Sequence, residues 1–61
     1  MNIKENVARL AAEKHLTLLE VERMAGLLPK STYRWNTNSP SIDKVVAVAN
    51  ALGVTVDELV K

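Results

Sequence analysis

The chain has 61 residues, with eight Lys and Arg, seven Asp and Glu, one His and no Cys, and its net charge is +1. This length supports one small domain, residues 1–61, and the absence of Cys excludes disulfides and thiolate metal sites. A single His cannot build a zinc site, so we expect neither metal nor cofactor. No apolar run approaches the ~20 residues of a membrane span. Charged residues also interrupt the N-terminus where a signal peptide would be apolar. We therefore expect a cytoplasmic protein with no membrane partner.

The first expected helix covers residues 3–14. Asn2 can cap it, and one face of the segment is apolar at helical spacing, through Ile3, Val7, Leu10 and Ala11. His15 follows at the position where a helix commonly ends in a left-handed residue. This pattern predicts an amphipathic helix packed on an aliphatic core.

Two short helices are expected next, at residues 17–25 and 29–36. Thr17 and Glu20 form a capping-box pair, Gly26 makes the turn, and Pro29 takes the first helical position of the second helix. The inner side of that helix is predicted to hold Leu27, Thr32 and Trp35. Its outer face is polar and follows i, i+3, i+4, i+7 spacing, through Lys30, Tyr33, Arg34 and Thr37.

The remaining chain predicts a polar loop at residues 37–41 and two more helices, at 42–52 and 56–60. Pro40 stops helical continuation and Ser41 can cap the helix that follows. We expect its inner face to consist of Ile42, Val45, Val46, Ala49 and Leu52. Gly53 ends it, and Thr55 with Glu58 opens the last helix.

Positive charge is concentrated in the middle of the chain. Residues 23–44 carry Arg23, Lys30, Arg34 and Lys44 against Asp43 alone, a net charge of +3, whereas the segments on either side are each at −1. The excess coincides with the polar face at 29–36 and the loop after it. A local cationic surface of this kind is typical of a phosphate-binding face.

The stretch from Leu16 to Trp35 resembles the helix-turn-helix of the lambda-repressor/Cro type, also called XRE-like. The residues that carry the resemblance are Leu16, Thr17, Glu20, Val21, Ala25, Gly26, Leu27 and Trp35. The segments PSIDK at 40–44 and ALGVTVDEL at 51–59 resemble the last two helices of the same family. The resemblance spans nearly the whole chain.

The resemblance implies an all-α fold of five helices with a helix-turn-helix formed by the second and third. It also implies sequence-specific binding of double-stranded DNA through the major groove, as in a transcriptional regulator or repressor, and a weak homodimer on paired half-sites. The residues expected to read bases are Lys30, Arg34, Pro29 and Tyr33. Those expected to meet the DNA backbone are Thr17, Leu18, Ser31, Thr37, Asn38, Ser39 and Ser41.

Departures from the family pattern keep two alternatives open. Leu18 stands where the family often has a phosphate-contacting glutamine; it can pack on a sugar or thymine methyl, or lie exposed. Leu28 stands where a capping Ser or Thr is preferred. These apolar residues are compatible with a DNA binder redesigned on this scaffold, or with a helical protein-interaction module that does not bind DNA. No catalytic constellation or glycine-rich phosphate loop is present, so we expect neither an enzyme nor a small-molecule substrate.

Overall fold

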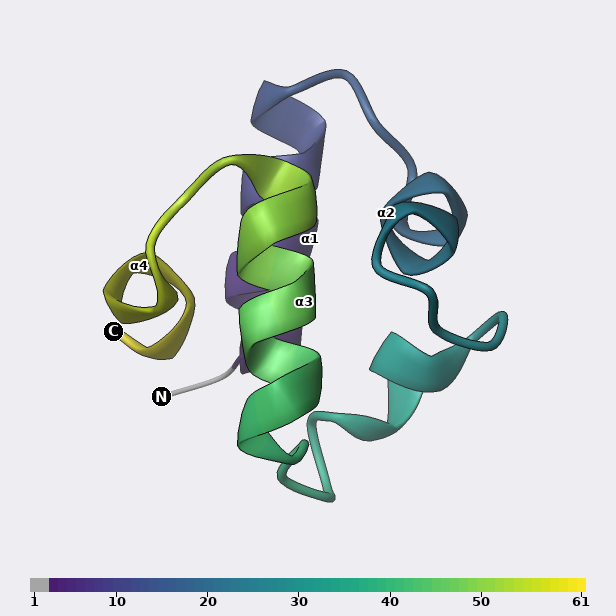
Figure 1. Cartoon of the computed structure of the whole chain (residues 1–61), viewed down its shortest axis with the longest axis vertical. Coiled ribbons are helices and arrows are strands. Elements are labelled where there is room, and N and C mark those ends of the chain that lie inside the picture. The colour runs from purple at the N-terminus through teal and green to yellow at the C-terminus, as the bar shows by residue number, and fades with distance from the viewer. Residues whose placement is uncertain (1–2) are drawn as a thin grey trace.

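The protein is all-α. The computed structural model describes residues 3–61, and within that range it contains four α-helices, one 3₁₀ helix and no strand (Figure 1). The elements in chain order are α1 (Ile3–Glu13), α2 (Leu18–Met24), the 3₁₀ helix η1 (Ser31–Arg34), α3 (Ile42–Leu52) and α4 (Val56–Val60). The predicted helices at 3–14, 17–25, 42–52 and 56–60 are confirmed. The predicted cap at Asn2 lies outside the described residues.

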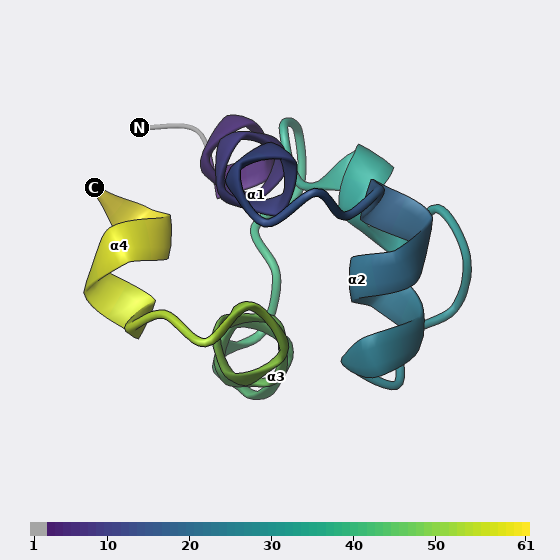
Figure 2. The same ribbon diagram turned by 90° about the horizontal axis from the view of Figure 1, so that it is seen from above.

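Two long helices form the centre of the domain. Figures 1 and 2 together show α1 and α3 running side by side in the same direction, with α2 on one flank and α4 on the other. Both short helices cross the central pair steeply, and η1 follows α2 on its flank. The two flanks are therefore separated by the central pair, and the segment expected to bind DNA belongs to only one of them.

Three of the α-helices end in the same way, with a residue of positive φ. His15 follows α1 with φ 59°, Gly26 follows α2 with φ 76°, and Gly53 follows α3 with φ 69°. In each case the next residue's N–H donates to a carbonyl five residues back, as Leu27 N does to Glu22 O at 2.8 Å. This is the Schellman motif, which glycine enters most easily. It confirms the predicted helix ends, including the one without glycine.

Side chains cap the starts of α2 and α4. Thr17 Oγ1 accepts from Glu20 N–H at 3.1 Å and Glu20 Oε1 accepts from Thr17 N–H at 2.9 Å, so the predicted capping box is complete. Thr55 Oγ1 accepts from Glu58 N–H at 3.3 Å. Ser41 is the N-cap residue of α3, but its hydroxyl makes no capping hydrogen bond within the described part of the chain. Ser41 therefore keeps an exposed hydroxyl.

The predicted α-helix at 29–36 is wrong in type and extent. Pro29 is not a first helical residue: it lies in a turn with Lys30, whose φ of 67° is left-handed. Only residues 31–34 are helical, and as a 3₁₀ helix with i to i+3 bonds such as Trp35 N–H to Thr32 O at 3.1 Å. The α-helix cannot begin at Pro29 because a left-handed residue directly after it breaks the helical path.

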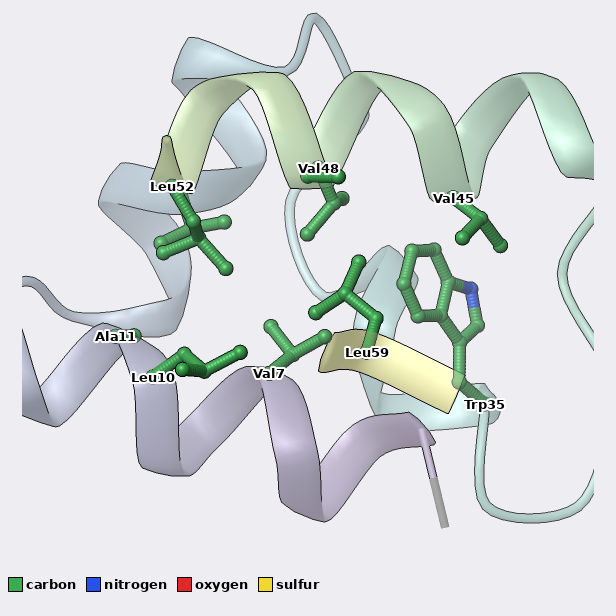
Figure 3. Close-up of a cluster of buried hydrophobic side chains, with 10 residues drawn as sticks. Val7, Leu10, Ala11, Trp35, Val45, Val48, Leu52 and Leu59 are labelled. Atoms are coloured by element: carbon green, nitrogen blue, oxygen red, sulfur yellow. The ribbon is translucent and has the colours of Figure 1, made fainter. Parts of the chain in front are cut away.

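The core is aliphatic with one aromatic residue, as predicted. Figure 3 shows the indole of Trp35 in one cluster of buried side chains with Val45 of α3 and Leu59 of α4. Trp35 is 8% exposed. The other buried hydrophobic residues are Val7, Leu10, Ala11, Val21, Val45, Val48, Ala49, Leu52 and Leu59.

The predicted inner face of α3 needs correction. Ile42 and Val46 are exposed, whereas Val48 is fully buried. The buried stripe is Val45, Val48, Ala49 and Leu52, which is i, i+3, i+4, i+7 spacing. Met24 of α2, which would continue the apolar side of that helix, is also exposed.

Helix α4 is attached to α1 by a polar contact as well as by Leu59. Asn6 Nδ2 donates to Leu59 O at 2.7 Å and to Lys61 O at 3.2 Å. These carbonyls lie at the C-terminal end of α4, where the helix cannot satisfy them itself. Asn6 therefore stabilises the end of a helix of only five residues. Within residues 3–61, the helices are all too short or too polar to cross a membrane.

Trp35 should be the aromatic residue on which folding depends most. Trp35→Ala removes a buried side chain and should lower the free energy of unfolding by about 3–5 kcal/mol. Tyr33→Ala is the matched control, because Tyr33 is 52% exposed on the same turn and should cost much less. Urea denaturation followed by circular dichroism gives both values. Equal midpoints for the two variants would mean that the indole does not stabilise the core.

Candidate nucleic-acid interface

The backbone between α2 and η1 is held by a buried carboxylate. Glu22 of α2 is 1% exposed. Its Oε1 accepts from Lys30 N–H at 2.8 Å, and its Oε2 accepts from Thr32 N–H at 3.0 Å and from the Thr32 hydroxyl at 2.6 Å. Thr32 is fully buried. The carboxylate thus does what an N-cap side chain would do, but from another helix.

These hydrogen bonds determine the ionisation of Glu22. Burial alone would raise its pKa, because it disfavours the charged form. The Thr32 hydroxyl, the Thr32 N–H and the Lys30 N–H all favour the carboxylate, and together they hold the pKa of Glu22 below its ordinary value of 4.5. The ionised form is therefore the one that the fold stabilises.

A 3₁₀ helix has three residues per turn, so residues three apart share a face. Thr32 and Trp35 are buried on the inner side of this segment, whereas Lys30, Tyr33 and Arg34 are exposed. The prediction that Leu27, Thr32 and Trp35 lie on the inner side is confirmed, with Leu27 partly buried against the core. The Thr32 hydroxyl donates to Glu22 and not to a carbonyl of its own segment.

An open groove of about 600 Å³ lies between the η1 segment and the start of α3. We call it the basic groove. Its lining combines three cations, four hydroxyls, one amide and a few apolar side chains. The residues are Leu28, Pro29, Lys30, Ser31, Tyr33, Arg34, Trp35, Asn38, Ser39, Pro40, Ser41 and Lys44. Among residues 3–61, no Asp or Glu contributes to this lining.

Cationic charge extends from the groove to α1. The Nζ of Lys4 lies 5.0 Å from the centroid of the Tyr33 ring, within the range of a cation–π contact. Lys30, Arg34 and Lys44 line the groove itself. Cations from three separate elements therefore lie at or beside the exposed face of η1.

Most of the residues predicted to bind DNA line this groove. They are Pro29, Lys30, Ser31, Tyr33, Arg34, Asn38, Ser39 and Ser41. Three predicted backbone contacts lie outside it. Thr17 is exposed at the start of α2 with its hydroxyl used for capping. Leu18 is partly buried against the core, and the Thr37 hydroxyl donates to Arg34 O at 3.2 Å.

Sequence reasoning missed Glu22, Lys44 and Lys4. Glu22 had an indirect signal: the segment at 28–30 offers no side chain to cap the turn that follows, so an acceptor had to come from elsewhere. Lys44 was counted in the local charge but not assigned to the site. Lys4 had no signal in the sequence, because its proximity to Tyr33 depends on how α1 packs.

Comparisons with known proteins do not identify the chain: no family model matches it, and no curated protein matches it. Within residues 3–61, no group of three or more His, Asp or Glu side chains is placed to hold a metal ion.

The Glu22 hydrogen bonds should make stability depend on acid pH. Because the folded-state pKa of Glu22 is lowered, its contribution is fully present above the ordinary pKa and is lost as the pH falls through the folded-state value. Glu22→Gln should therefore cost about 2 kcal/mol at neutral pH. The difference from the parent should narrow at acid pH, because the parent carboxylate then becomes protonated.

Urea denaturation at neutral pH and at pH well below 4.5 measures this difference. Glu13→Gln is the control, since Glu13 forms an exposed ion pair with Arg9 at 3.1 Å, of a kind that contributes little. If the difference in free energy of unfolding between the parent and Glu22→Gln stayed constant across the pH range, the assignment of the ionised form would be contradicted.

Proposed function

We propose that the basic groove binds double-stranded DNA, and that α2, the turn at Gly26 and η1 act as a helix-turn-helix of the lambda-repressor/Cro type. The observation that carries the proposal is a groove whose lining, within residues 3–61, includes Lys30, Arg34 and Lys44 and no carboxylate. A surface of this charge matches the DNA backbone, whose phosphates dominate protein–DNA affinity. The corresponding role is that of a transcriptional regulator in a bacterial or phage-type cytoplasm.

Base reading is assigned to the exposed side chains of the η1 segment. Lys30 and Arg34 carry donors that suit guanine O6 and N7 in the major groove. Tyr33 is 52% exposed beside them and can donate through its hydroxyl, and Pro29 offers an apolar edge. All four residues are exposed, whereas Thr32 and Trp35 of the same segment are buried.

Backbone contacts are assigned to the loop and to the start of α3. Asn38, Ser39 and Ser41 provide amide and hydroxyl groups, and Lys44, which was not among the predicted contacts, provides a further cation. Ser31 lies nearer to Leu28 and Pro29. Its hydroxyl donates to the Leu28 carbonyl, and its oxygen can still accept. Such contacts orient a protein on the duplex without reading its sequence.

The size of η1 limits how much sequence one protomer reads. Four residues of 3₁₀ helix are about 8 Å long at roughly 2.0 Å per residue. Base pairs follow one another every ~3.4 Å along the duplex. One protomer therefore reads about two or three base pairs, and useful specificity requires paired half-sites, about 34 Å apart for a dimer of this family.

A protein-interaction module is the alternative function, and exposed apolar side chains favour it. Met24, Leu28 and Ile42 are 57%, 79% and 65% exposed. Leu18, which the sequence offered for the same role, is partly buried and does not contribute. Salt separates the two functions, because phosphate binding weakens steeply as salt rises and apolar docking does not.

Arg34 and Asn38 should differ in how they affect DNA binding. Arg34→Ala removes a base contact and should cost about 1–3 kcal/mol while relaxing preference at one position. Asn38→Ala removes a backbone contact and should weaken all sequences alike. The measurement uses the tightest duplex selected from random sequences and a panel of its single-base-pair variants.

Two results would change the assignment. If Arg34→Ala weakened every duplex equally, Arg34 would be a phosphate contact and base reading would pass to Lys30 and the tip at Leu28 and Pro29. If neither variant altered binding at low salt, the DNA-binding proposal would be wrong and the protein-interaction function would replace it. Glu13→Gln, a change on α1 away from the groove lining, is the control for nonspecific effects of charge.

A further inference from the structure

We propose that Glu22 is the positioning residue of the interface: it holds the η1 segment in its binding conformation before DNA arrives. This inference rests on the proposed DNA-binding function. Glu22 is 1% exposed, so it is not itself a contact to a partner. It acts through the backbone of Lys30 and Thr32.

Glu22 links α2 to the segment that follows the Gly26 turn, a connection that also packs on the core through Leu27. It belongs to α2, and its acceptors bind the segment eight and ten residues later. The two carboxylate oxygens divide the work: Oε1 takes the Lys30 N–H, and Oε2 takes both Thr32 donors. Residues 30 and 32 are thus held relative to α2 from one buried point.

The backbone at Lys30 needs such support. Its φ of 67° is in the left-handed region, which is unfavourable for a residue other than glycine. If the hydrogen bond to Glu22 were lost, the Lys30 N–H would have no acceptor. The turn would then lose the bond that favours its left-handed conformation. Without Glu22, the segment should sample other conformations in which Lys30 and Arg34 diverge.

The effect on DNA binding follows from the fraction of the protein that is in the binding-competent conformation. A protein whose binding-competent conformation is populated only in part binds with an affinity reduced by that fraction. Removal of the carboxylate should therefore weaken DNA binding even when the domain remains folded. The number of cations that meet phosphate is unchanged, so the salt dependence of binding should keep its slope.

The first experiment tests the tie in the free protein. Amide hydrogen exchange by NMR should show that Glu22→Gln loses protection at Lys30 and Thr32 by about tenfold or more relative to Val48 in the core. If Lys30 and Thr32 were as protected in Glu22→Gln as in the parent, the claim that Glu22 holds this backbone would be wrong. This measurement needs no DNA, and it decides the conformational claim independently of the proposed function.

The second experiment measures affinity for a fluorescently labelled mixed-sequence DNA duplex at low salt, at a temperature where each variant is folded. Glu22→Gln should bind about tenfold more weakly, with the same salt slope as the parent. Val60→Ala is the matched control: Val60 is partly buried on α4, on the opposite flank. Its folded form should bind as the parent does, although it is less stable.

A second variant covers the case in which Glu22→Gln does not fold. Thr32→Val keeps the shape of the buried side chain and deletes only the hydroxyl that donates at 2.6 Å. It should lose affinity by a smaller factor, again without a change in slope. Equal affinity of the parent and both folded variants would overturn the positioning role and leave Glu22 a stability residue. If the parent itself did not bind the duplex at low salt, the proposed function would be wrong. The exchange data would still show whether Glu22 holds the backbone of Lys30 and Thr32.

Discussion

The segment that forms the basic groove depends on one buried carboxylate. Placing an ionised group in the interior costs several kcal/mol, and Glu22 offsets this cost with three hydrogen bonds to Lys30 and Thr32. Every donor involved belongs to the segment after the turn. The same interaction therefore compensates the buried charge, supports the left-handed turn at Lys30 and caps the start of η1. Loss of the carboxylate would leave the Thr32 hydroxyl buried without its acceptor.

The 3₁₀ geometry converts that anchor into a surface with two different sides. With three residues per turn, Thr32 and Trp35 both point into the core. The residues between and before them, Lys30, Tyr33 and Arg34, are then exposed together. A short segment held from both sides in this way does not need the length of an α-helix to present its cations. Its small reach is the reason that we assign only two or three base pairs to each protomer.

The features that the sequence predicted are those decided by neighbouring residues. The capping box of Thr17 and Glu20 and the helix ends at His15, Gly26 and Gly53 depend on residues within one turn, and all are present. The features that it missed depend on contacts across the fold. Glu22 and Thr32 are ten residues apart, and nothing local marks Glu22 as buried or pairs it with Thr32.

The predicted inner face of α3 was wrong for a different reason. Its sequence places apolar residues at five consecutive positions, 45–49, so several faces satisfy helical spacing equally well. Packing against α1, α2 and α4 selects the stripe that includes Val48 and leaves Val46 outside. In the candidate site, the groove-lining residues of the loop were predicted from their polarity and position, whereas Lys44 and Lys4 required the folded geometry.

The central claim is that the basic groove is the surface that meets DNA, and NMR shift mapping tests it most directly. ¹⁵N-labelled protein titrated with the selected duplex at low salt should show its largest amide shifts in residues 30–34 and 38–44. Amides of α4, on the opposite flank, should change little. Shifts concentrated in α4, or no shifts at low salt, would contradict the account.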